Sequence, residues 1–330
     1  MTLRVAMLSR WHVHANEYCN SINRNEAAEV VAVWDEQTDR GKDWATELNV
    51  PFVTDYENLL IRDDVDAVCV VTPTNMHRNV MVAAAEAGKH IFTEKVLTTS
   101  VSEARDVAAA IKSNNVTFCI SFPRRCLPEL KYAKQAVEDG LVGDVTLVRI
   151  RIAHAGSIRD WLPEHFYDPE ACGGGAMMDL GAHGMYLARW LVGKPRRVVS
   201  IFSNITERSV EDNAVSVIEF ENGAIAVNET SFVGYPDSYS LELDGTNGGV
   251  RMLSPKDGVE IRSDALDTRG WNKVEKLPDR SISPIDQWIS GCLDGTEIDF
   301  GIEEAVQLTE LMDAAYRAHE TGESAKIELA

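Results

Sequence analysis

The first third of the chain alternates short apolar runs with segments of helical periodicity, and this alternation constrains the fold more than any other feature. The apolar runs are rich in valine and isoleucine and are bounded by charged or turn-forming residues, which is typical of buried strands. They span residues 3–8, 30–34, 67–71, 90–92 and 117–120, and the helical segments between them span residues 14–23, 38–48, 75–87 and 102–114. Strands that alternate with helices form a parallel sheet covered on both faces. We therefore predict an α/β domain with a doubly wound parallel sheet over residues 1–121.

A different pattern begins after Ile120. Residues 145–153, 197–204, 213–220, 224–232, 239–243, 249–253 and 258–262 are β-rich runs, mostly without helices between them. Such runs form a large, mostly antiparallel open sheet. Helical periodicity in residues 128–139, 176–192, 283–293 and 302–321 supplies helices that can cover one of its faces. Residues 122–330 are thus predicted to form an α+β domain, and the second face of its sheet is left to solvent or to a partner.

The net charge of −20, from 32 basic and 52 acidic residues, opposes binding to nucleic acid or to an anionic membrane. No apolar stretch approaches the ~20 residues that a membrane-spanning helix needs. The six cysteines form no CxxC pair and no signal-like leader precedes the first strand, so we expect a cytoplasmic protein whose cysteines are core residues. This composition predicts small molecules and other copies of the chain as partners.

The turn after the first strand contains no glycine. Dinucleotide-binding domains usually carry a glycine-rich turn there, whereas this chain has Ser9, Trp11, His12 and His14. The following helix can still present its amide N–H groups to a phosphate, so we expect Ser9, Trp11 and His12 to contact a cofactor. A doubly wound domain that has lost its cofactor is the alternative. Because no third ligand lies near the two histidines in the sequence, no metal site is predicted.

Asp35 ends the second predicted strand, a little over twenty residues beyond that turn. A carboxylate at this position can accept hydrogen bonds from the adenosine ribose hydroxyls and would repel a 2′-phosphate. It therefore favours NAD over NADP. The competing interpretation is an aspartate that merely caps the next helix.

Two further strings lie at the ends of predicted parallel strands, where ligands bind in this class of fold. The first is Thr72-Pro73-Thr74-Asn75-Met76-His77, which otherwise is only a capped turn. The second is Glu94-Lys95, in which the ammonium can bind a substrate hydroxyl and stabilise a developing alkoxide. A surface ion pair is the alternative for the second string.

Asp179 and His183 are four residues apart on a predicted helix, and therefore on one face of it. An imidazole beside a carboxylate can transfer a proton near neutral pH. The preceding glycines at 173–175 permit a close approach of the backbone to a ligand. A surface ion pair or a core histidine is the alternative.

Taken together, these strings resemble the Gfo/Idh/MocA family, the group of glucose-fructose oxidoreductase and inositol dehydrogenase. The family's TP…H…AGKH…EKP stretch resembles three strings of this chain, namely Val70-Val71-Thr72-Pro73 with His77, Ala87-Gly88-Lys89-His90, and Glu94-Lys95. Its GG…DxGxH motif resembles Gly173-Gly174-Gly175 followed by Asp179-Leu180-Gly181-Ala182-His183. The chain departs from the pattern at Val96, where proline is usual, and at the glycine-free turn. The resemblance implies a Rossmann domain that binds dinucleotide, followed by a domain for substrate binding and oligomerisation.

The resemblance also implies roles for individual residues. Lys95 would be the catalytic lysine, His183 the proton-transferring histidine and Asp179 a carboxylate that holds the substrate. Asp35 would bind the adenosine ribose. The nicotinamide ribose would be lined by Thr72, Pro73, Asn75, His77 and Glu94.

The function predicted from these residues is hydride transfer between NAD and a secondary alcohol of a sugar, polyol or cyclitol. Arg124, His154 and Trp161 are candidates for the substrate pocket, since two can hydrogen-bond hydroxyls or a carboxylate and the indole can stack on a sugar face. We also expect a homodimer or homotetramer built through the carboxyl-terminal sheet. The alternatives are an NAD-dependent, redox-neutral glycosidase and a non-catalytic dinucleotide-binding regulator.

Overall fold

The computed structural model describes residues 2–266 and 270–327 and divides into two compact units. One consists of the chain up to Phe122 together with Ile282–Thr309, and the other of Pro123–Ser281 together with the chain from Glu310 onward. The sequence pattern alone leaves residues 282–309 with the second domain. In the structure they pack with the first unit, where Ile120 N donates to Phe300 O (2.9 Å) and Cys119 Sγ lies 3.3 Å from Pro284 O.

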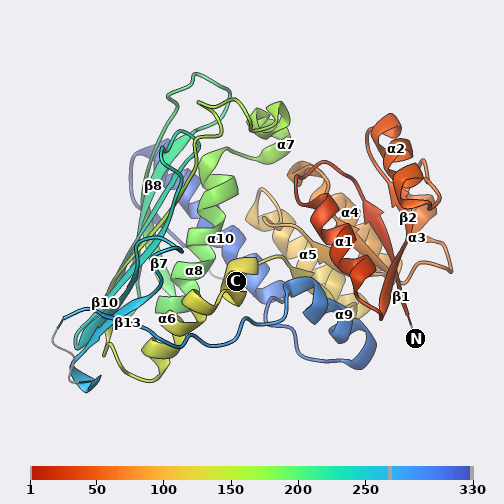
Figure 1. Ribbon diagram of the computed structural model, residues 1–330. Coiled ribbons are helices and arrows are strands. Elements are labelled where there is room, and N and C mark those ends of the chain that lie inside the picture. The colour runs from red at the N-terminus through yellow and green to blue at the C-terminus, as the bar shows by residue number, and fades with distance from the viewer. Residues whose placement is uncertain (1, 267–269, 328–330) are drawn as a thin grey trace. The chain divides into compact units, whose positions relative to one another are not determined.

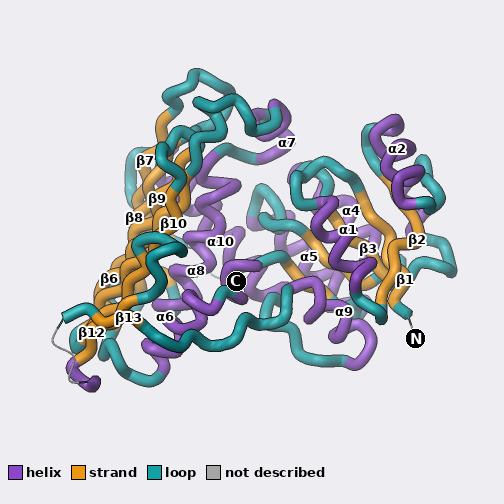
Figure 2. Tube along the Cα trace, viewed as in Figure 1, coloured by secondary structure: helices purple, strands orange, loops and turns teal. Residues whose placement is uncertain are grey.

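The first unit is built on a five-stranded parallel sheet, which confirms the predicted doubly wound domain (Figures 1 and 2). In the order β2-β1-β3-β4-β5, its strands are β2 (Ala28–Trp34), β1 (Leu3–Leu8), β3 (Ala67–Val70), β4 (His90–Thr93) and β5 (Phe118–Ile120). Its helices are α1 (Ala15–Arg24), α2 (Thr38–Leu48), α3 (Tyr56–Leu60), α4 (His77–Glu86), α5 (Val101–Asn114), α9 (Pro284–Asp294) and the 3-10 turn η1 (Thr74–Met76). Because the strands are parallel, their carboxyl ends share one edge.

One helix of the first unit departs from the expected strict alternation of strand and helix. Both α2 and α3 lie between β2 and β3. Asp55 caps the short helix α3, since its side chain accepts a hydrogen bond from Glu57 N and so replaces one of the missing helical bonds. Five residues are too few to show a helical period in the sequence.

The second unit contains a nine-stranded sheet in the order β13-β12-β11-β10-β6-β9-β8-β7-β14. The strands are β6 (Val145–Ala153), β7 (Pro195–Ser203), β8 (Asn213–Phe220), β9 (Ile225–Ser231), β10 (Ser238–Gly245), β11 (Gly248–Met252), β12 (Glu260–Ser263), β13 (Asn272–Lys273) and β14 (Ala325–Lys326). Among the strands of the described residues, β6 and β9 are the one parallel pair in this sheet, so the predicted mostly antiparallel sheet is confirmed. The helices that belong with it are α6 (Pro128–Glu138), α7 (Pro169–Cys172), α8 (Ala182–Val192) and the end of α10 (Ile302–Thr321), with 3-10 turns η2 (Pro123–Cys126), η3 (Glu164–Tyr167) and η5 (Asp264–Leu266).

The helix that carries His183 packs closely on this sheet, as Figure 2 shows for α8. It is preceded by a π-helical turn, η4 (Met177–Gly181), where the sequence predicts a continuous α-helix. Asn228 Nδ2 donates to Gly181 O (2.9 Å), and a Cβ on Gly184 would lie 1.9 Å from Asn228 Oδ1. Because Gly181 and Gly184 have no side chains, the helix can pack close to β9, and this close packing sets the distance of His183 from the sheet.

The opposite face of the same sheet carries an exposed stripe of apolar side chains across four adjacent strands, and these side chains are 38–74% exposed. Charged residues lie among them, since Val215 faces Glu229 and Ile225 faces Glu219. The stripe contains Leu147, Val199, Ile201, Val215, Val217 and Ile225. Val199 faces Val217 across β7 and β8, and Ile201 faces Val215.

Among the helices within residues 2–266 and 270–327, none has the length and apolar character needed to cross a membrane. The six cysteines all lie in the described ranges and form no disulfide; five of them are buried.

Candidate active site

The turn after β1 keeps the backbone of a glycine turn without a glycine. Ser9 has a φ of 80°, the left-handed region that glycine adopts most easily, and its Oγ accepts a hydrogen bond from Trp11 N (3.0 Å). Ser9, Trp11 and His12 are buried. Because α1 begins at Ala15, directly after the turn, its first N–H groups have no partner within the helix and can face a phosphate. The turn therefore suits a dinucleotide despite its composition.

Glu94 is the centre of a buried polar cluster at the carboxyl end of β4. Its Oε2 lies 3.1 Å from His14 Nδ1 and 3.8 Å from His12 Nδ1, and it accepts a hydrogen bond from Tyr18 Oη. Its Oε1 accepts from Lys95 N (2.9 Å). Burial alone would raise the pKa of Glu94, but the neighbouring His12, His14 and Lys95 lower it well below its usual range. Glu94 is thus a fixed anion that organises the two histidines.

The ligand atoms of His12, His14 and Glu94 all lie within 4.8 Å of one another. Two imidazoles and a carboxylate could hold a divalent transition metal, and the sequence alone gave no third ligand because Glu94 is 80 residues away. The cluster lies at the amino-terminal end of α1, however, where the helix dipole favours an anion. The absence of a metal site stays our prediction.

Lys95 and Thr72 lie at the same edge of the parallel sheet. The side chain of Lys95 is buried, with only 5% exposed, and its peptide bond to Val96 is cis. Thr72 Oγ1 is buried and has no hydrogen-bond partner among the described residues. A buried hydroxyl without a partner is costly unless a ligand supplies one, so the residues present fit a bound cofactor.

His77 joins the two strings that follow β3 and β4. Its Nδ1 lies 2.9 Å from Val96 O, and its Nε2 lies 3.1 Å from Thr72 O. Burial lowers the pKa of His77, and the carbonyl groups of Leu97, Val96 and Thr72 oppose this shift. Both ring nitrogens face backbone carbonyls, so His77 links the turn after β3 to the segment after Lys95 and holds that segment in place. Of the other predicted residues here, Pro73 is buried and Asn75 is exposed.

In the second unit, His183 is buried on α8, and Tyr186 holds its ring. His183 Nδ1 lies 3.0 Å from Tyr186 Oη, and Tyr186 Oη accepts from Arg124 N (3.3 Å). Burial raises the pKa of Tyr186, so its hydroxyl stays protonated. The Arg124 guanidinium lies 4.3 Å from the centre of the Tyr239 ring. The structure thus places Arg124, predicted as a pocket residue, in one network with His183.

Asp179 lies in the π-helical turn before α8, a type of turn that is frequent at functional sites. Its charge acts on His154: burial lowers the pKa of His154, and Asp179 and Asp237 oppose this. His154 Nδ1 accepts from Gly156 N (3.0 Å). The structure therefore places Asp179 near a second predicted pocket residue as well as on the segment that leads to His183.

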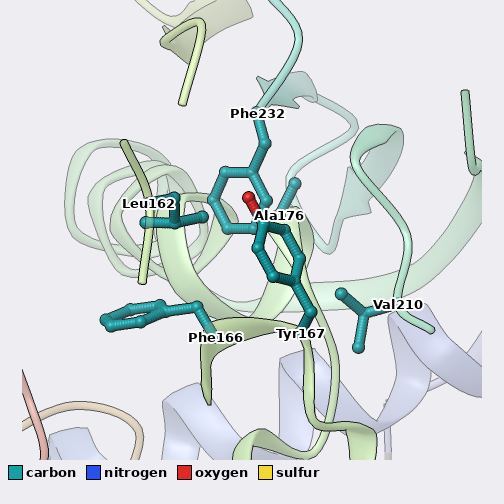
Figure 3. Packing of buried hydrophobic residues seen from close by; sticks show 6 residues of the cluster. All are labelled: Leu162, Phe166, Tyr167, Ala176, Val210 and Phe232. Carbon is teal, nitrogen blue, oxygen red and sulfur yellow. The ribbon is translucent and has the colours of Figure 1, made fainter. Parts of the chain in front are cut away.

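His154 lies between two aromatic rings. It stacks on Phe232 at 5.1 Å between ring centres, and Trp161 lies 4.6 Å away and is 54% exposed. Phe232 belongs to a buried apolar cluster shown in Figure 3 with Leu162, Phe166, Tyr167, Ala176 and Val210. Leu162, directly after Trp161, belongs to this cluster, which therefore anchors the segment that carries the exposed indole.

Two of the three glycines at 173–175, Gly174 and Gly175, are required by packing within the protein. A Cβ on Gly174 would lie 2.0 Å from Tyr316 Oη, and a Cβ on Gly175 would lie 2.1 Å from Glu211 O. The sequence suggested a close approach of backbone to ligand, whereas the close approach in the structure is to Tyr316 and Glu211.

Three residues that the sequence did not single out contribute to these groups. Tyr186 is three residues after His183, and this helical spacing was a usable signal. Tyr18 carried no such signal, because the sheet brings Glu94 to it from 76 residues away. Arg40 lies five residues after Asp35 and hydrogen-bonds to it, and this spacing matches no regular helical or strand period.

Comparison with known proteins agrees with this geometry. Residues 12–122 match a family model described as an oxidoreductase family with an NAD-binding Rossmann fold, and residues 130–251 match the GFO/IDH/MocA C-terminal domain. The parallel sheet and the first match define an oxidoreductase with an NAD-binding Rossmann domain.

Individual relatives point the same way. The uncharacterized oxidoreductase YrbE of Bacillus subtilis (strain 168) is 32% identical over 243 residues, which cover 71% of this chain and 69% of the relative. A scyllo-inositol 2-dehydrogenase (NAD(+)) of the same organism is 30% identical and covers 72% of this chain, with 69% of its own length matched. The crystal structure of GenD2 from gentamicin A biosynthesis, in complex with NAD, has a TM-score of 0.85 at 25% identity and covers 99% of this chain and 97% of its own. The chain belongs to the GFO/IDH/MocA family of oxidoreductases.

Proposed function

We propose that this oxidoreductase transfers a hydride between NAD and a secondary alcohol carbon of a sugar, polyol or cyclitol. The observation that carries the proposal is the buried Lys95 beside the anion Glu94 at the ligand-binding edge of the parallel sheet. An ammonium at this edge can hydrogen-bond a substrate hydroxyl and stabilise a developing alkoxide.

Three side chains carry the proposed hydride-transfer chemistry. The nicotinamide, when bound, accepts or supplies the hydride. His183 takes the hydroxyl proton during oxidation, Lys95 stabilises the alkoxide, and Asp179 accepts a hydrogen bond from a substrate hydroxyl. For His183 to take the proton on Nε2, that nitrogen must be unprotonated, so Nδ1 carries the ring proton and donates it to Tyr186 Oη. Tyr186 thereby fixes both the tautomer and the orientation of the ring.

The test is turnover and NAD affinity for His183→Ala and Lys95→Ala, after a screen of sugars, inositols and sugar acids by nicotinamide absorbance. Each variant should lose roughly 10²–10⁴ in kcat, the range of positioned acid–base groups, while NAD affinity changes little. Near-normal turnover in both variants would refute the mechanism. Loss of NAD binding together with activity would make the residues structural, and hydrolysis without net NAD reduction would indicate the glycosidase.

For the substrate class, the proposal uses the names of the relatives together with Trp161. An exposed indole beside His154 can stack on the apolar face of a sugar or cyclitol ring. Trp161→Ala should therefore raise KM more than it lowers kcat, because a stacking contact is made equally in ground and transition state.

For the cofactor, we propose a preference for NAD over NADP. Asp35 and Glu36 both lie at the end of β2, and a 2′-phosphate beside two carboxylates should bind more than tenfold weaker, a loss above ~1.4 kcal/mol. Fluorescence titration with both dinucleotides measures this, and equal or tighter binding of NADP would refute it.

For the assembly, we propose a homodimer or homotetramer in which a second copy covers the exposed apolar stripe of the carboxyl-terminal sheet. Exposed apolar side chains that gather on one face of a sheet are typical of surfaces covered by another subunit. A cytoplasmic location is part of the same proposal.

A further inference from the structure

The carboxylate of Asp35 has no free hydrogen-bonding capacity. Its Oδ1 accepts from Gln37 N (2.7 Å) and Arg40 Nη2 (2.8 Å), and its Oδ2 accepts from Arg10 N (2.8 Å) and Arg40 Nε (2.9 Å). A carboxylate offers about four acceptor positions, and four N–H groups fill them. A ribose hydroxyl can therefore bind Asp35 only when one of these donors leaves.

Arg40 is the donor that can leave. The N–H groups of Arg10 and Gln37 belong to the backbone at the edge of the sheet, whereas the Arg40 side chain is 23% exposed and extends from α2. Its Nη2 also lies 2.5 Å from Glu36 Oε1 and 3.3 Å from Ser9 Oγ. The guanidinium thus lies over the two carboxylates and reaches the turn that follows β1.

We propose that Arg40 is the residue that sets the selectivity between NAD and NADP, by covering Asp35 and by being the cation that a 2′-phosphate would pair with. This inference rests on the proposed function, since it assumes that a dinucleotide binds at this edge. Binding of NAD has to displace Arg40 from Asp35, which weakens the affinity for NAD. Binding of NADP gains an ion pair with the displaced guanidinium, which offsets part of the repulsion by Asp35 and Glu36. Arg40 therefore reduces the preference for NAD over NADP. With the two carboxylates alone, this preference would be larger.

The experiment is calorimetric titration of NAD and NADP into the wild-type protein and three variants. Arg40→Gln should raise the ratio of Kd for NADP to Kd for NAD by about tenfold or more, the effect of losing a charge-assisted hydrogen bond. Arg40→Lys keeps the charge without the two-pronged geometry and should give an intermediate ratio. Lys42→Gln is the matched control, because it removes the same charge from an exposed position on the same helix and should leave the ratio within about twofold.

An unchanged ratio in Arg40→Gln, or an equal loss of affinity for both dinucleotides, would overturn the role of Arg40. Thermal unfolding of each variant shows whether it is folded. If Arg40→Gln does not fold, the ratio of the two Kd values in Arg40→Lys is compared with that of the wild-type protein instead. A wild-type protein that binds neither dinucleotide would overturn the proposed function itself, which is a different result from binding with an unchanged ratio.

Discussion

Replacing Tyr186 by phenylalanine removes one hydroxyl from the second unit and leaves the ring that packs there. The hydroxyl lies 3.0 Å from His183 Nδ1 and 3.3 Å from Arg124 N, and both His183 and Tyr186 are buried. A buried polar group that loses its partner costs about 1–3 kcal/mol. The contact with Arg124 N is long, so we count one full hydrogen bond and a weak one and expect a loss of about 2 kcal/mol in the free energy of unfolding. The retained ring leaves no cavity to add to this loss.

The same substitution should slow catalysis. Without the hydroxyl, the His183 ring is no longer held in one orientation and one tautomer, so kcat should fall about tenfold or more while NAD affinity stays unchanged. A changed pH dependence of kcat/KM would separate this effect from simple destabilisation, because it reports on the protonation of the histidine.

The stability assay is urea unfolding of Tyr186→Phe beside Tyr235→Phe. Tyr235 is 70% exposed in the same unit, so its hydroxyl contributes little and its variant should stay within about 0.5 kcal/mol of wild type. If Tyr186→Phe is as stable as the control and turns over substrate at the wild-type rate, Tyr186 does not hold His183 and our account of the network is wrong.

Three other predictions concern packing, pH and assembly. Gly184→Ala should destabilise the protein by about 1–3 kcal/mol in urea unfolding, because the new Cβ meets Asn228, which is itself held by Gly181; wild-type stability would contradict this. The lowered pKa of Glu94 contributes stability that is fully present above its ordinary value of 4.5 and is lost as the pH falls below it. Glu94→Gln should therefore make stability less dependent on pH below about pH 5, and an unchanged loss of stability in acid would refute this. Val217→Asp in the exposed stripe should convert the expected oligomer to monomer in light scattering, and a wild-type protein that is already monomeric at micromolar concentration would refute the interface.

Much of the fold followed from local patterns in the sequence. The bounds expected for β1, α2, β6, β8 and α10 are those of the structure, because each element is long enough to show its period and is bounded by charged or turn-forming residues. The short elements α3, α7 and β13 were missed, since two to five residues do not display a period. The π-helical turn before α8 was also missed, because its hydrogen-bond pattern depends on how the segment packs on β9.

The candidate site divides in the same way. The sequence allowed five candidate residues to be recognised by their type and position: Asp35, Glu94, Lys95, Asp179 and His183. For the residues that follow parallel strands this is possible because their place at the end of a strand fixes the edge of the sheet at which they lie. Which groups these residues meet could not be recognised. Hydrogen bonds between residues far apart in the chain, such as those around Glu94, exist only after the sheet has placed β1 beside β3 and β3 beside β4. The charge of Asp35 could be recognised in the sequence, but its hydrogen bonds to Arg40 and to two backbone amides could not. These bonds depend on the tertiary structure, because the geometry of the turn and of the helix start determines which donors reach the carboxylate.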